Sequence, residues 1–141
     1  MFTKPKFEQR MALWLEFRES LEESEDPFRT ALDFYNQAPL VNLNADPWDQ
    51  DTWPTPWELV EWNQYCPFTT VLGICYSLQL TDRFKGSSFE IHIGIDRNTS
   101  TTYYLLYVGD TIIGWDSMQI DQLEITEDFE SQMTYRMPPL Q

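Results

Sequence analysis

The sequence predicts an α+β domain in which helices precede strands. Apolar residues recur at helical spacing in the first half, and from Phe89 onward they alternate with polar residues, as in a half-buried strand. Helices followed by strands are typical of this fold class. The 141 residues, 42% of them hydrophobic, suffice for one core. We therefore expect a single domain with a helical part at 1–37, a core at 38–125 and a tail at 126–141.

Two amphipathic helices are expected in the N-terminal part. The first covers about 7–21, where apolar residues gather on one face. The second begins at Asp26 and Pro27, because the carboxylate can cap the first turn and proline fits the first helical position. Residues 40–54 are rich in Asn, Asp and Pro, which predicts an ordered loop.

Four of the six tryptophans lie between Trp48 and Trp62. Tryptophan is large and apolar, so this segment is expected to be a buried structural centre. Within it, residues 55–58 form a complete capping box that predicts a short helix. Cys66 and Pro67 repeat the cap-and-proline pattern and open a helix to about Leu80. Few polar residues interrupt that helix, which is therefore expected to be the buried central one.

A three- to four-stranded antiparallel meander is expected to follow. Its strands cover 89–96, 103–108 and 111–115, with Gly109 and Asp110 as a two-residue hairpin turn. A fourth strand is expected near 120–125. The tail shows no clear periodicity.

Net charge and motif content exclude several function classes. The formal net charge is −14 with a pI near 4.2, which argues against direct nucleic-acid binding. The acids indicate a solvated surface or, as an alternative, an acidic DNA mimic that inhibits a host nucleic-acid enzyme. No apolar run is long enough to span a bilayer, so no membrane partner is expected. One histidine and two cysteines predict no metal site, and no cofactor motif is present.

Cys66 is the strongest candidate for chemistry. At a helix N-terminus the unpaired amides favour a thiolate, and a strand histidine (His92) and a later strand carboxylate (Asp116) follow in the chain. This order over residues 57–116 resembles the Cys-His-Asp order of papain-like and transglutaminase-like cores. The resemblance implies catalytic roles for Cys66, His92 and Asp116 in a small cysteine hydrolase or transferase.

Strand register provides a test of that triad. If Asp96 pairs with Ser100 or Thr101, and Val108 pairs with Thr111, then His92 points away from the Cys66 helix. His92 and Asp116 would also lie two strands apart, roughly 9–10 Å. This register predicts no triad, whereas a slip of one residue would reverse the result.

The sheet face that carries His92 is a candidate contact surface. Either the N-terminal helices cover it in part, which we favour, or it is an apolar patch that docks a protein partner. The predicted interaction residues are Tyr103, Leu105, Tyr107 and Ile112 of this face, together with Tyr135 of the tail.

Several runs of the sequence resemble a family of small uncharacterised proteins from tailed phages of marine cyanobacteria. These are 46–59, Tyr65–Cys66, 72–84 and 89–93. The resemblance implies a phage gene product, located in the cytoplasm of an infected bacterial host or in the virion. It brings no site residues.

The first functional prediction is accordingly a non-enzymatic phage protein, a virion-associated or assembly component that works through contacts with a phage structural or host protein. The aromatic sheet face and the tail would make those contacts. The cysteine hydrolase and the acidic inhibitor remain the alternatives, and no cofactor is expected in any of them.

Overall fold

The computed structural model describes residues 1–41, 46–114 and 129–140. Helices α1 (Phe7–Glu23), α2 (Pro27–Tyr35), α3 (Pro56–Trp62) and α4 (Pro67–Gln79) precede the strands β1 (Phe89–Asp96), β2 (Thr101–Val108), β3 (Thr111–Gly114) and β4 (Phe129–Arg136). A 3₁₀ turn, η1 (Gln50–Thr52), lies before α3. The α+β prediction is confirmed. None of the helices described here is long and apolar enough to cross a membrane.

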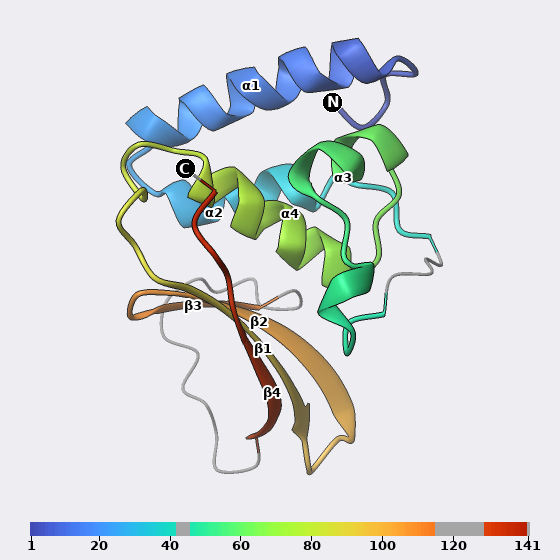
Figure 1. Cartoon of the computed structure of the whole chain (residues 1–141), viewed down its shortest axis with the longest axis vertical. Coiled ribbons are helices and arrows are strands. Elements are labelled where there is room, and N and C mark those ends of the chain that lie inside the picture. The colour runs from blue at the N-terminus through green and yellow to red at the C-terminus, as the bar shows by residue number, and fades with distance from the viewer. Residues whose placement is uncertain (42–45, 115–128, 141) are drawn as a thin grey trace.

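The helices form a layer on one face of a four-stranded antiparallel sheet (Figure 1). The strand order is β3-β2-β1-β4, and α4 lies between the sheet and the other helices. We call the face toward α4 the inner face; it carries Ile91, Ile93 and Leu106, each fully buried. The outer face carries His92, Leu105 and Tyr107.

Local sequence signals place the starts of three helices. Asp26 accepts a hydrogen bond from the Arg29 N–H and caps α2. Thr55 and Glu58 form the capping box of α3, and Cys66 caps α4 in the same way. Each of these helices has proline at its first position, where the missing N–H costs nothing. These three starts confirm the sequence prediction.

The strand register also confirms the prediction. Asp96 pairs with Thr101, and Val108 pairs with both Phe89 and Thr111. Gly109, at φ +58°, supplies the left-handed conformation that the hairpin turn requires.

A strand was expected near 120–125, and these residues lie outside the described residues. The tail, where no regular element was expected, supplies β4, which pairs with β1. A β-bulge interrupts this pairing between Ile93 and Gly94. The tail then continues along the core: the Met137 N–H donates to the Phe89 carbonyl at 2.9 Å, and Gln79 Nε2 donates to the Pro138 carbonyl at 3.0 Å.

Helix α4 is held in the helical layer by a polar contact in its last turn, at Ser77. The Ser77 hydroxyl oxygen accepts a hydrogen bond from Trp14 Nε1 of α1 at 2.9 Å and lies 3.1 Å from the Tyr35 hydroxyl of α2. Beside it, Gly73 lets the Tyr35 ring approach α4 closely. Trp14 and Tyr35 are each about 1% exposed, so these polar atoms depend on Ser77 for a partner.

Gly73→Ala is expected to destabilise the protein. The new Cβ would lie 2.5 Å from Cε1 of Tyr35, whose ring is enclosed by Phe2, Phe17 and Tyr65 and cannot move aside. We expect the free energy of unfolding to fall by about 1–3 kcal/mol. Helix propensity alone would raise the free energy of unfolding by about 1 kcal/mol. The sign of the change measured by urea unfolding therefore shows whether the clash with Tyr35 outweighs helix propensity.

The matched control is Gly86→Ala, because no atom lies within 4 Å of the added Cβ. Its free energy of unfolding should change by less than about 0.5 kcal/mol. A stabilising Gly73→Ala would contradict the close packing of Tyr35 on α4.

Candidate functional site

Cys66 occupies the N-cap of α4, half-buried at one end of the buried helix. Its Sγ accepts a hydrogen bond from the Thr69 N–H at 3.5 Å, and the Thr69 hydroxyl lies equally close at 3.5 Å. In return the Cys66 N–H donates to the Thr69 hydroxyl at 2.8 Å. The thiol thus takes the place that a serine or threonine hydroxyl usually takes in a capping box.

On the inner face of the sheet, Tyr104 is close enough to Cys66 for the two groups to interact electrostatically. Burial, followed by the negative charge of a Cys66 thiolate, raises the pKa of Tyr104. Tyr104 lies on the inner face of β2 opposite Ile93, and its ring packs 5.5 Å from that of Phe68. A phenol with a raised pKa is protonated at neutral pH, so Tyr104 cannot take a proton from Cys66. Tyr104 was not among the residues to which the sequence assigned a role.

His92 lies on the outer face and contacts a different set of residues. Its ring stacks on Tyr107, with centroids 3.8 Å apart and planes at 16°. Its Nδ1 is 3.4 Å from the Thr134 hydroxyl, and its Nε2 is 3.7 Å from a carboxylate oxygen of Glu90. Since neighbouring residues of a strand point to opposite faces, His92 faces away from α4 while Ile91 and Ile93 face toward it.

The described residues do not bring the predicted catalytic group together. Cys66 lies at the inner face and His92 at the outer face, so the imidazole does not reach the thiol. Asp116 lies outside the described residues. Because His92 is the only histidine in the sequence, no other imidazole can serve Cys66. Among the described residues, the hydrogen-bond partners of the Cys66 thiol are the Thr69 N–H and hydroxyl, and neither is a base.

The predicted contact residues are less exposed than expected. Leu105 on the outer face is 4% exposed, and Tyr135 of β4 faces inward, 8% exposed, with its ring 4.7 Å from that of Trp53. Tyr103, Tyr107 and Ile112 are half-buried on the outer face. The helices lie on the inner side only, so the expectation that they cover the outer face is wrong (Figure 1).

The tryptophan segment is also more exposed than expected. Trp48, Trp57 and Trp62 are 50%, 48% and 42% exposed. Helix α3 has seven residues and buries Leu59 and Val60, which leaves both of its tryptophans at the surface. The prediction of a buried centre is wrong for these three. The short helix has only one face for the core, and Trp48 lies in the loop before η1.

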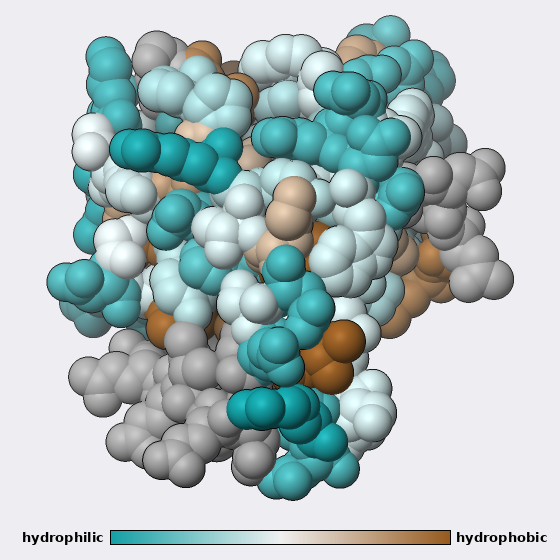
Figure 2. All heavy atoms as spheres, turned by 60° about the horizontal axis from the view of Figure 1, so that its bottom comes forward, coloured by the Kyte–Doolittle hydropathy of each residue, from teal (hydrophilic) through white to brown (hydrophobic). Residues whose placement is uncertain are grey.

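The view of the strand end of the molecule shows mainly hydrophilic side chains, with apolar ones in small separate groups (Figure 2). Among residues 1–41, 46–114 and 129–140, no group of three or more His, Cys, Asp or Glu side chains could hold a metal ion.

The fold is similar to that of cysteine proteases. Two solved structures of LapG from Legionella pneumophila, one of them calcium-bound, match with a TM-score of 0.66 and 14% and 13% sequence identity. Each match covers 94% of this chain and 77% of the LapG chain. The LapG proteins are cysteine proteases. At this identity the likeness shows a shared fold. No protein-family model and no curated protein matches the sequence.

The two cysteines are expected to react differently in the folded protein. Cys66 is partly exposed, whereas Cys75 is fully buried within α4 and burial raises the pKa of its thiol. Iodoacetamide at pH 8 should therefore alkylate Cys66 and leave Cys75 unmodified until denaturant is added. Peptide mass spectrometry gives the extent at each site. Equal modification of both cysteines under native conditions would contradict the placement of α4.

Proposed function

We propose that this chain is a non-enzymatic protein that acts through contacts with another protein, built on a fold that cysteine proteases also use. The observation that carries the proposal is the separation of Cys66 from the only histidine of the chain by the thickness of the sheet. Thiol catalysis needs a base within hydrogen-bond reach of the nucleophile, and Tyr104 does not provide one.

Exposed tryptophans support the contact role. Trp48, Trp57 and Trp62 each leave more than 40% of their surface to solvent. Tryptophan is strongly enriched among residues that dominate binding energy at protein interfaces. The net charge of −14 favours a partner whose surface is neutral or basic. Residues of α3 and the loop before it therefore replace Leu105 and Tyr135 as the proposed contact residues.

A thiol hydrolase is the second candidate, favoured by the likeness to LapG. Cys66 is partly exposed and lies at a helix N-terminus, as a nucleophilic cysteine would. This candidate needs a proton acceptor other than His92.

A hydrolysis assay separates the two candidates. The full chain, its Cys66→Ser variant and the control Cys75→Ala are incubated with fluorogenic casein and with an activated thioester. The contact proposal predicts the same background rate for all three proteins, since no base serves the thiol. A rate that falls at least tenfold in Cys66→Ser but not in Cys75→Ala would establish the hydrolase instead.

The proposed setting is a phage particle or an infected bacterium, following the resemblance of residues 46–59 and 72–84 to cyanophage proteins. Quantitative mass spectrometry of purified virions is expected to find the chain in a fixed ratio to the major structural proteins. Its absence from particles, together with its presence in infected-cell lysate, would eliminate the virion version of the proposal.

A further inference from the structure

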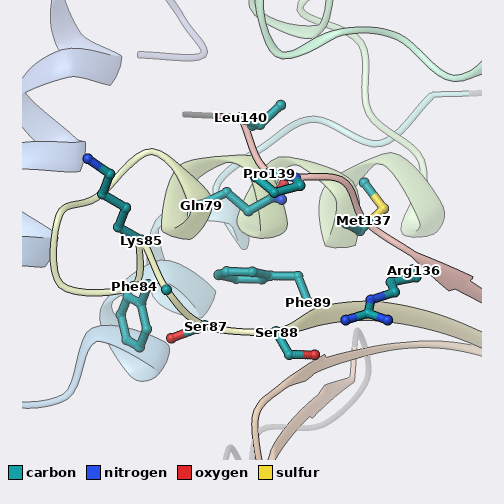
Figure 3. Close-up of a pocket in the computed structure, with 11 residues that line it drawn as sticks. Gln79, Phe84, Lys85, Ser87, Ser88, Phe89, Arg136, Met137, Pro139 and Leu140 are labelled. Atoms are coloured by element: carbon teal, nitrogen blue, oxygen red, sulfur yellow. The ribbon is translucent and has the colours of Figure 1, made fainter.

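A cavity of about 280 Å³ lies at the opposite end of α4 from Cys66 (Figure 3). Its walls come from three segments far apart in sequence: the end of α4, the 84–89 connection into β1, and the 136–140 end of the chain. Two hydrogen bonds fix the last segment to the others, from the Met137 N–H to the Phe89 carbonyl and from Gln79 Nε2 to the Pro138 carbonyl. The cavity is thus preformed, which lowers the cost of binding a ligand.

The charge around this cavity is opposite to that of the whole chain. The sequence has 23 acidic and 9 basic residues, yet none of the lining residues is acidic and two of them, Lys85 and Arg136, are basic. Neither forms an ion pair with a described residue. Glu90, which pairs with Arg136 across the strands, has its carboxylate 3.7 Å from His92.

Figure 3 shows the guanidinium of Arg136 extending past Phe89 on the same side as Ser88, while the ammonium of Lys85 points away from Phe89. Arg136 is therefore the cation that faces the cavity, and Ser87 and Ser88 supply hydroxyl donors beside it. A guanidinium can hold a carboxylate or phosphate through two parallel hydrogen bonds.

Apolar side chains make up much of the rest of the wall, beside the polar Gln79. Phe84, Phe89, Met137 and Leu140 line it, and Phe89 and Met137 are 4% and 9% exposed. An apolar wall beside a cationic donor group fits a ligand that has both an apolar body and an anionic head. The volume is slightly below the range of about 300–1,000 Å³ that suits drug-sized ligands, which indicates a smaller molecule.

We propose that the cavity between the 84–89 connection and the C-terminal segment binds a small organic anion, with Arg136 and the two serines holding the anionic group and the apolar wall holding its body. This site is independent of Cys66 and of the proposed contact role.

The test is an NMR titration of the full chain with sodium hexanoate, using hexanamide as the uncharged isostere. Hexanoate should cause saturable shifts at the Phe89 and Met137 amides, with a Kd of about 1 mM or tighter. Hexanamide should bind at least tenfold more weakly. The affinity for hexanoate should also fall as salt is raised, because the anion is held by charge.

Variants of Arg136 test the assignment of the anionic group. Arg136→Gln should weaken hexanoate binding at least tenfold, and Arg136→Lys should give an intermediate loss because it keeps the charge without the planar fork. Arg97→Gln is the matched control, an exposed arginine in the β1–β2 connection, and should leave the affinity within twofold. Dispersed amide spectra check that each variant is folded.

Three results would overturn the proposal. They are the absence of saturable shifts with hexanoate, equal affinity for hexanamide, and an Arg136→Gln variant that binds hexanoate as the parent or as Arg97→Gln does.

Discussion

The packing of α4 against α1 and α2 is the constraint on which the rest of the structure depends. The Ser77 hydroxyl oxygen accepts a hydrogen bond from the indole N–H of Trp14 and lies within hydrogen-bond distance of the Tyr35 hydroxyl. The Ser77 hydroxyl itself donates to the Gly73 carbonyl at 2.8 Å. These contacts fix α1 and α2 to the same turn of α4. A buried polar group without a partner costs about 1–3 kcal/mol, so the helix has one favourable rotation. That rotation places Cys66 at the inner face of the sheet.

The alternation of strand residues decides what Cys66 can do there. A shift of one residue in β1 would exchange Ile93 for His92 beneath the helix. The observed register instead buries Ile91 and Ile93 completely and directs His92 to Tyr107 and Thr134. Burial of two isoleucine side chains is worth about 3–6 kcal/mol, which holds the register firmly. A fold similar to that of LapG thus carries a thiol at the inner face and its histidine at the outer face.

Much of this arrangement could be predicted from the sequence because its signals are local. The proline-and-cap pairs gave the starts of α2, α3 and α4, and the alternation of β1 with the Gly109 turn gave the register. Features that depend on distant contacts could not be predicted. Met133, Tyr135 and Met137 do alternate, and Met133 stands opposite the buried Ile93, yet it is 44% exposed. Beyond Met133 a bulge breaks the register, so β4 had no clean signal. The cavity forms only because residues 136–140 lie against the 84–89 connection. No sequence pattern relates these two segments, so the cavity could not be predicted.

The central claim is that the sheet separates the imidazole of His92 from the thiol of Cys66. Nuclear Overhauser contacts of the His92 ring protons, measured in uniformly labelled protein, test it most directly. This separation predicts contacts from His92 to the Tyr107 ring and to Thr134, with ring-current shifts from the stack, and contacts from the Cys66 β-protons to the Thr69 amide proton. A contact between the His92 ring and the Cys66 β-protons would contradict the account and support a catalytic Cys–His pair.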